Sequence, residues 1–264
     1  MATVTIYWHY FLQFLKASMV YKADFFASVF AGILSSASGL IFVLALIDGK
    51  VVPALAGWSR AEVLLIYGFS MVASGLFSMV SRNIYGFSER YIIEGEFDRV
   101  LLRPLNSLAQ VVFDAFHLEG LGTAIFGAVI VSIFARDAGL RFSPATCLWL
   151  VLAAISGAVI LMSVFVILAA TAFHFEDRIG IAPPFYNLIT FARYPAEVYS
   201  RRMQFFLSFI VPFAFTSFYP VAVLLGKGEY AWLGWFTPLV ALCCALLAGA
   251  FWRFGVSRYM STGS

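Results

Sequence analysis

Charged residues are scarce in this sequence. Only 12% of its 264 residues are Asp, Glu, Lys or Arg, whereas 62% are hydrophobic, and the mean hydropathy is +0.92. A water-soluble protein of this length would need more charged surface, so the scarcity indicates that lipid surrounds most of the chain. The 17 basic residues are spread along the sequence and form no dense cluster of the kind that follows phosphate groups. A nucleic-acid partner is therefore not expected.

Cysteine is rare, and the motifs of common catalytic sites are missing. The three cysteines, Cys147, Cys243 and Cys244, lie inside apolar stretches and suit neither a metal site nor a disulfide framework, so we interpret them as small packing residues. Two Gly-Lys pairs, at 49–50 and 226–227, lack the flanking residues of a Walker A phosphate loop. His-Glu-x-x-His, Cys-x-x-Cys and Gly-x-Ser-x-Gly are absent as well. We expect no enzyme, and no cofactor or metal bound by this chain itself.

Long apolar runs, by contrast, are abundant. A helix crosses a hydrocarbon layer of roughly 30 Å with about 20 apolar residues. Residues 61–80 contain only one charged residue, Glu62, and five further stretches contain none: 25–47, 120–135, 142–173, 203–226 and 230–252. The alternating ten-residue pattern of membrane barrel strands is absent. The sequence predicts an all-α, polytopic membrane helical bundle of six transmembrane helices, forming a single domain over residues 1–264.

Residues 1–24 predict a helix that lies along the membrane surface. In a helical conformation this segment separates apolar from polar side chains on opposite faces. The apolar face carries Tyr7, Phe11, Phe14 and Leu15, and the polar face carries His9, Gln13 and Lys16. We therefore predict an N-terminal interfacial helix.

The position of the fifth span has two interpretations. Hydropathy alone takes residues 203–226 as the span and leaves residues 176–202 as a cytosolic loop. The alternative crosses earlier, through residues 179–192, and makes the later apolar run a re-entrant segment on the outer side. Pro212 and Pro220 would break that run into short helices, which favours the re-entrant hairpin.

Orientation follows from the excess of Lys and Arg on the cytosolic side. With the hydropathy-based fifth span, twelve of the 17 basic residues lie on one side and five on the other. The earlier crossing transfers Arg193, Arg201 and Arg202, which changes the balance to nine against eight. Both termini are predicted to be cytosolic, although the earlier crossing weakens this charge argument.

The longest polar loop, residues 82–107, contains a short amphipathic helix. Pro104 ends the element, because the residue before a proline is disfavoured in a helix. Its apolar face is predicted to carry Phe97, Val100 and Leu101, opposite Glu96, Asp98, Arg99 and Arg103. Such a helix at the cytosolic face suits the docking of a soluble partner. An ordinary interfacial helix would show the same pattern.

Three ionisable residues precede the third apolar run and allow two interpretations. Asp114, His117 and Glu119 would serve as a proton relay if they lay at membrane depth, because ionisable groups there are costly and usually functional. At headgroup level they would be ordinary polar residues. The uncharged run starts only at Gly120, which favours the second interpretation.

Several motifs resemble one branch of the ABC type-2 exporter permeases. The resemblance covers nearly the whole chain, with the motifs in the family's order, and it carries no information on the substrate. The first motif follows the second span, the next group follows the fourth span, and the last lies in the tail. They are Glu94–Asp98 with Leu101–Leu105; Tyr194–Tyr199, Ile210–Phe215 and Tyr219-Pro220; and Arg258–Gly263.

The resemblance implies a transport complex in a bacterial inner membrane. This chain would be its permease subunit, with six spans, both termini cytosolic and a re-entrant hairpin at about residues 199–228 before the last helix. Partners would be an ABC ATPase dimer, which binds ATP and Mg, and a second permease chain, similar or identical. Residues 82–107 would form the coupling region, with ATPase-coupling residues Glu94, Glu96, Phe97, Asp98, Arg99 and Arg103. The competing hypothesis is an ATP-independent proton-coupled carrier or channel.

Overall fold

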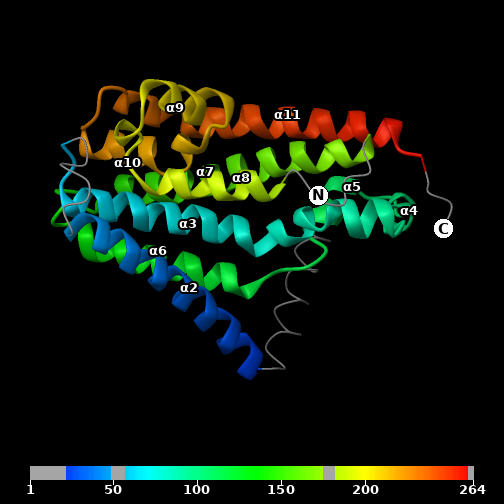
Figure 1. The fold of residues 1–264 in the computed structure, drawn as a ribbon, viewed down its shortest axis with the longest axis horizontal. Coiled ribbons are helices and arrows are strands. Elements are labelled where there is room, and N and C mark those ends of the chain that lie inside the picture. Colours follow the sequence, from blue (N-terminus) through cyan, green and yellow to red (C-terminus); the bar gives the residue numbers. More distant parts are fainter. Residues whose placement is uncertain (1–21, 49–56, 175–181, 261–264) are drawn as a thin grey trace.

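The computed structural model describes residues 22–48, 57–174 and 182–260. Within these ranges all regular elements are helical, which confirms the all-α prediction. The long helices α3, α6, α7 and α11 run along the long axis of the molecule, and α2 is inclined against them (Figure 1). Their bounds are Lys22–Asp48 for α2, Arg60–Tyr85 for α3, Leu118–Phe134 for α6, Pro144–Ala170 for α7 and Thr237–Arg258 for α11. Of the predicted interfacial helix, only residues 22–24 are described, and they begin α2.

In the described part of the chain, four helical segments are long and apolar enough to cross a membrane. They are Lys22–Ala45, Arg60–Ile93, Pro144–Phe173 and Ala231–Arg258. Two shorter helices lie among them: α6 has 17 residues, and α8 (Ala182–Ile189) continues as the 3-10 turn Thr190–Arg193. A polytopic helical membrane bundle is thus confirmed, while the count of six spans stays a prediction.

The chain that leads into the apolar run 120–135 does not form a continuous helix. A short helix, α5 (Ser107–Val112), is followed by an irregular stretch before α6 begins at Leu118. The cause is the buried side chain of Asn83, whose Nδ2 donates hydrogen bonds to the carbonyl oxygens of Val112 (2.9 Å) and Ala115 (2.8 Å). Because these carbonyl groups are satisfied by Asn83, the backbone does not need to continue the helix there.

Glycines allow α3 and α6 to lie unusually close together. Gly68 and Gly75 on α3 face Gly127 and Gly120 on α6, with the same seven-residue spacing in two antiparallel helices. A Cβ atom at Gly75 would lie only 2.5 Å from the backbone nitrogen of Ala124. In lipid, where water does not drive helices together, small residues at such positions provide the close packing that holds a bundle. This glycine seam therefore fixes the centre of the fold.

The apolar run 203–226 is folded back on itself. It forms α9 (Arg201–Phe205), a π-helical turn at Phe206–Ile210, a bend at Pro212, a 3-10 turn at Phe213–Thr216, and α10 (Phe218–Leu225). The hydroxyl groups of Ser208 and Tyr219 join the two arms with a hydrogen bond of 2.8 Å. The outer location predicted for this segment stays a prediction.

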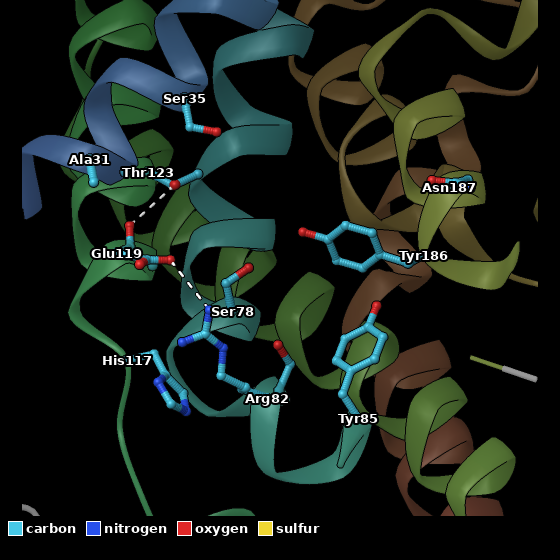
Figure 2. Close-up of a pocket in the computed structure, with 13 residues that line it drawn as sticks. Ala31, Ser35, Ser78, Arg82, Tyr85, His117, Glu119, Thr123, Tyr186 and Asn187 are labelled. Atoms are coloured by element: carbon cyan, nitrogen blue, oxygen red, sulfur yellow. Dashed lines mark hydrogen bonds and ion pairs between the residues drawn. The ribbon is translucent and has the colours of Figure 1, made fainter. Parts of the chain in front are cut away.

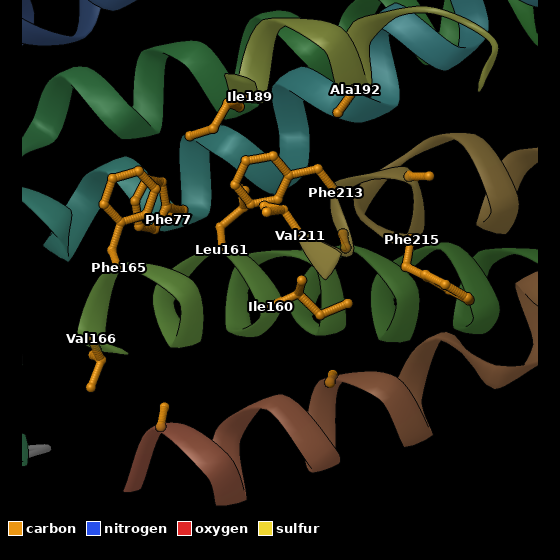
Figure 3. Close-up of a cluster of buried hydrophobic side chains, with 14 of the residues drawn as sticks. Phe77, Ile160, Leu161, Phe165, Val166, Ile189, Ala192, Val211, Phe213 and Phe215 are labelled. Atoms are coloured by element: carbon orange, nitrogen blue, oxygen red, sulfur yellow. The ribbon is translucent and has the colours of Figure 1, made fainter. Parts of the chain in front are cut away.

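Side chains of this folded segment complete the core of the bundle. Phe213 is fully buried, and with Val211 it lies over Ile160 and Leu161 of α7 (Figure 3). The chain on both sides of the segment is tied to the beginning of α3. There the Trp58 Nε1 donates to a Glu197 carboxylate oxygen (2.9 Å), and Lys227 pairs with Glu62 (2.6 Å). The folded segment is thus held both by apolar packing and by polar contacts at one end of the bundle.

Candidate functional site

The predicted coupling helix exists as α4 (Glu96–Leu101) and lies at one end of the bundle, with α5 and the last turns of α11 (Figure 1). The chain reaches it through the π-helical segment Phe87–Ile93, which extends α3. Gly95, just before α4, has φ of +74°, a left-handed conformation that glycine adopts without steric cost. This conformation lets the chain turn sharply from the extension of α3 into α4.

Phe97 anchors α4 in an aromatic cluster. Its side chain is fully buried, and its ring centroid lies 5.7 Å from that of Phe87, 5.1 Å from Phe173 and 5.1 Å from Tyr259. Trp252 of α11 also contacts Phe97, at 6.1 Å. The cluster joins α4 to the extension of α3, the end of α7 and the end of α11. Phe97 was predicted among the coupling residues; the structure places it as the anchor of α4 and not on its outer face.

We expect Phe97→Ala to detach α4 from the bundle. Removing a buried phenylalanine costs about 3–5 kcal/mol, and aromatic pairs add about 0.5–1.5 kcal/mol each. Amide hydrogens of α4 should then exchange at least tenfold faster in a mass-spectrometric hydrogen-exchange experiment. The matched control is Leu101→Ala on the same helix, whose side chain is 45% exposed. Equal protection of α4 in both variants would contradict the anchoring role of Phe97.

Two of the predicted coupling carboxylates also face the protein itself. Glu96 accepts a hydrogen bond of 2.7 Å from Arg90, whose guanidinium also donates to Asp114 at 2.8 Å. Asp98 lies beside the tail, where burial and this carboxylate raise the pKa of the Tyr259 hydroxyl to about 12. Glu96 and Asp98 therefore tie α4 to neighbouring segments and leave the outer face to other residues.

The outer face of α4 combines positive charge with apolar side chains. Arg99 and Arg103 are exposed, as the amphipathic pattern predicts, and Glu94 is exposed as well. Leu101 was predicted on the apolar face with Phe97 and Val100; it is the last residue of α4, and its side chain is 45% exposed, whereas Phe97 and Val100 are buried. Leu102 is 85% exposed. We call Glu94, Arg99, Leu101, Leu102 and Arg103 the α4 surface; an exposed apolar pair rimmed by charge is typical of a protein contact site.

A second polar feature lies within the bundle, and sequence analysis missed it. A cavity of about 650 Å³ lies between α2, α3, α6 and α8, which we call the membrane cavity (Figure 2). Six of its 13 lining residues carry a hydroxyl group, including the phenols Tyr85 and Tyr186. Ser78, Arg82 and Tyr85 follow one another on one helical face of α3, and this spacing was the available signal.

Opposite charges face each other in the membrane cavity. The guanidinium of Arg82 lies 3.9 Å from the Glu119 carboxylate, and both side chains are more than half exposed, at 66% and 56%. Burial and, to a lesser extent, the nearby Arg82 lower the pKa of His117 below its usual range. His117 is therefore neutral at pH 7, and the cavity has no net charge at that pH.

The structure separates the three residues considered as a proton relay. His117 and Glu119 line the membrane cavity, whereas Asp114 pairs with Arg90 near α4. Among the described residues, no three His, Cys, Asp or Glu side chains are grouped as metal ligands would be. All three cysteines are free, and Cys147 and Cys243 are exposed, which corrects their interpretation as packing residues. The side chains of Cys147 and Cys243 lie on the outside of the bundle, in α7 and α11. Lipid there solvates apolar groups as favourably as a protein core does.

Comparison with known proteins identifies one family. A family model described as ABC-2 family transporter protein matches residues 34–263 of the chain. The match includes α4 and all residues that line the membrane cavity except Ala31 and Gly32. Comparisons with curated proteins and with solved structures give no match.

Proposed function

Because this chain belongs to the ABC-2 transporter family, we propose that it is an exporter permease that docks onto its ATPase through the α4 surface. Membership of the family makes the chain the permease component of an ABC transporter. It is a multi-pass membrane protein, it associates with an ABC ATPase, and it has no ATPase site of its own. Export, the docking residues and the composition of the complex are parts of the proposal.

The observation that carries the proposal is the two-sided construction of α4. Its inner side is fixed to three helices through Phe97, and its outer side exposes Arg99, Leu102 and Arg103. A helix built in this way can transmit a push or pull from a bound protein to the bundle, because packed interiors transmit strain with little deformation. A solvated surface helix would not need the anchor.

The proposed mechanism is alternating access. ATP and Mg bind to the partner ATPase subunits, whose closure would bring the α4 helices of two permease chains toward each other. The extension of α3, the end of α7 and α11 each contribute a ring to the aromatic cluster, and these rings contact one another. The cluster would therefore pass this movement to all three helices. The substrate would then leave outward or laterally along the interface of the two permeases in a bacterial inner membrane.

Cysteine labelling can test on which side of the membrane each connecting segment lies. In our proposal α4 and both termini are cytosolic, and the folded segment at about residues 199–228 is re-entrant from the outside. A cysteine at the exposed Arg202, introduced after replacement of Cys147, Cys243 and Cys244 by alanine, should be labelled by an impermeant maleimide in intact cells. If residues 203–226 were a straight span, Arg202 would be cytosolic and would stay unlabelled.

Two controls calibrate the labelling experiment. A cysteine at Arg99, on the α4 surface, should react only after the membrane is opened. A cysteine at Glu229, which pairs with Arg201 at 2.9 Å, should react from outside in either interpretation of the fifth span. Labelling at Arg99 in intact cells would contradict the proposed orientation.

Co-purification and ATP hydrolysis test the function as a whole. The chain expressed with its ATPase should purify as a complex whose ATPase activity depends on the α4 surface. The competing function, a proton-coupled carrier, would use His117 and Glu119 in the membrane cavity. Proton flux through proteoliposomes that contain this chain alone, measured with an internal pH dye, would favour the carrier. No flux without the ATPase is expected.

A further inference from the structure

We infer that the membrane cavity binds an uncharged, hydroxyl-rich headgroup that is attached to an alkyl chain. The inference rests on the proposed transport function, since it names the class of substrate. It arises from four features of the cavity: its place between four helices, its unpaired polar atoms, its balance of charge and its apolar border.

The location of the cavity makes its polarity significant. Its lining comes from α2 and α3, which lie in segments long and apolar enough to cross a membrane, and from the shorter helices α6 and α8. Polar side chains within such segments are costly in contact with lipid and usually mark a path for a substrate or an ion. A volume of about 650 Å³ also falls within the range of roughly 300–1,000 Å³ that is usual for small-molecule sites.

Two lining residues carry buried polar atoms that lack a hydrogen-bond partner. Among the described residues, neither the Tyr85 hydroxyl nor the His117 Nε2 has one. Figure 2 shows Tyr85 and Tyr186 with their hydroxyl groups directed toward the space between α3 and α8. Buried groups of this kind are nearly always paired in folded proteins. A ligand with several hydroxyl groups can supply the missing partners.

The balance of charge argues for a ligand without net charge. Arg82 and Glu119 are 3.9 Å apart, so an anion attracted by the guanidinium would be repelled by the carboxylate. A cation attracted by the carboxylate would likewise be repelled by the guanidinium. A vicinal diol, in contrast, can donate to the carboxylate and accept from the guanidinium at the same time. The neutral His117 adds no charge at pH 7.

An apolar border lies directly beside the polar lining. Ala31 and Ser35 of α2 line the cavity, and their neighbours Phe30 and Leu34 are exposed, at 63% and 61%. A headgroup in the cavity can therefore leave its alkyl chain along α2, where apolar surface and lipid surround it. This arrangement fits an amphiphile better than a fully water-soluble sugar.

Photo-crosslinking tests the inference with defined probes. The purified chain in lipid nanodiscs is exposed to three probes with the same diazirine-bearing alkyl chain, which differ in headgroup: glucoside, phosphate and trimethylammonium. We expect the glucoside to label the chain about tenfold more efficiently than either charged probe, equivalent to the loss of one or two hydrogen bonds. Crosslinks should map to residues 78–85, 117–123 or 186–187.

Two cavity variants locate the binding site, and a third variant controls for nonspecific partition of the probe into the membrane. Ser78→Leu on α3 and Asn187→Leu on α8 fill the cavity from opposite sides and should each reduce glucoside labelling at least fivefold. The control is Ser132→Leu on α6, where an exposed serine lies outside the cavity, and its labelling should match the unaltered chain.

Equal labelling by the three probes, or glucoside labelling unaffected by both cavity variants, would overturn the inference. The headgroup comparison uses the unaltered chain, so it remains decisive even if a variant does not fold. Co-purification with the ATPase tests the proposed function separately. Intact ATPase binding without headgroup preference would refute only the substrate class, whereas absent ATPase binding would refute the proposed function itself.

Discussion

A chain carrying Leu102→Asp together with Arg103→Glu should lose its ATPase during purification. Leu102 is 85% exposed in the described structure, and Arg103 lies beside it. A few side chains at the centre of an interface, with arginine prominent among them, contribute most of the binding energy, with losses of about 2 kcal/mol or more when they are removed. A loss of this size corresponds to a drop of more than about tenfold in affinity, and charge reversal adds repulsion.

The measurement compares the amount of ATPase that co-purifies and the ATPase activity of the complex. Asp98 is left unchanged in this design, because it lies beside Tyr259 and its replacement would disturb the attachment of α4. The matched control is Arg136→Glu with Phe142→Asp, an exposed pair in the connection between α6 and α7. If ATPase recovery were the same in the two double variants, the α4 surface would not be the docking site.

Replacing Gly75 with leucine is expected to prevent the bundle from assembling. Even a Cβ atom at this position would lie 2.5 Å from the backbone nitrogen of Ala124 and 2.7 Å from the carbonyl oxygen of Gly120. These are backbone atoms, so a leucine can be accommodated only if α3 and α6 separate. Overpacking a core costs about 1–3 kcal/mol where side chains can adjust, and more where they cannot.

The expected result is a fall of about tenfold in monodisperse protein recovered by size-exclusion chromatography, in line with a loss of more than about 1.4 kcal/mol. Gly249→Leu is the matched control, since it introduces the same residue into α11, where no atom lies within 4 Å of the added Cβ. Gly75→Leu protein that elutes and melts like the Gly249→Leu protein would show that the glycine seam does not hold the bundle together.

The same seam explains why the polar cavity can exist beside a tightly packed centre. Gly75 and Gly120 bring α3 and α6 into backbone contact, and one or two turns further along α3 the residues Ser78 and Arg82 line the cavity, where Arg82 lies 3.9 Å from Glu119 of α6. The close contact keeps the frame rigid while the cavity stays open.

The amphipathic pattern of residues 94–105 predicted the short helix α4, but it assigned only some of its side chains to the correct face. Spacing placed Phe97 and Val100 on a common buried face, as the structure confirms. It did not predict that Leu101, the last residue of α4, is 45% exposed. The pattern also could not show that Glu96 is held by Arg90, since the two residues meet across a turn that the sequence does not define.

The sequence by itself determined that this protein is an all-α membrane protein, because the length of an apolar run is a local property that the bilayer thickness sets. Its motifs also indicated the transporter family, which the match over residues 34–263 shows. Only the tertiary structure decided that the apolar run 203–226 folds back between Ser208 and Tyr219. It alone revealed the membrane cavity, because periodicity gives the polar face of one helix, whereas packing decides which faces of α2, α3, α6 and α8 meet.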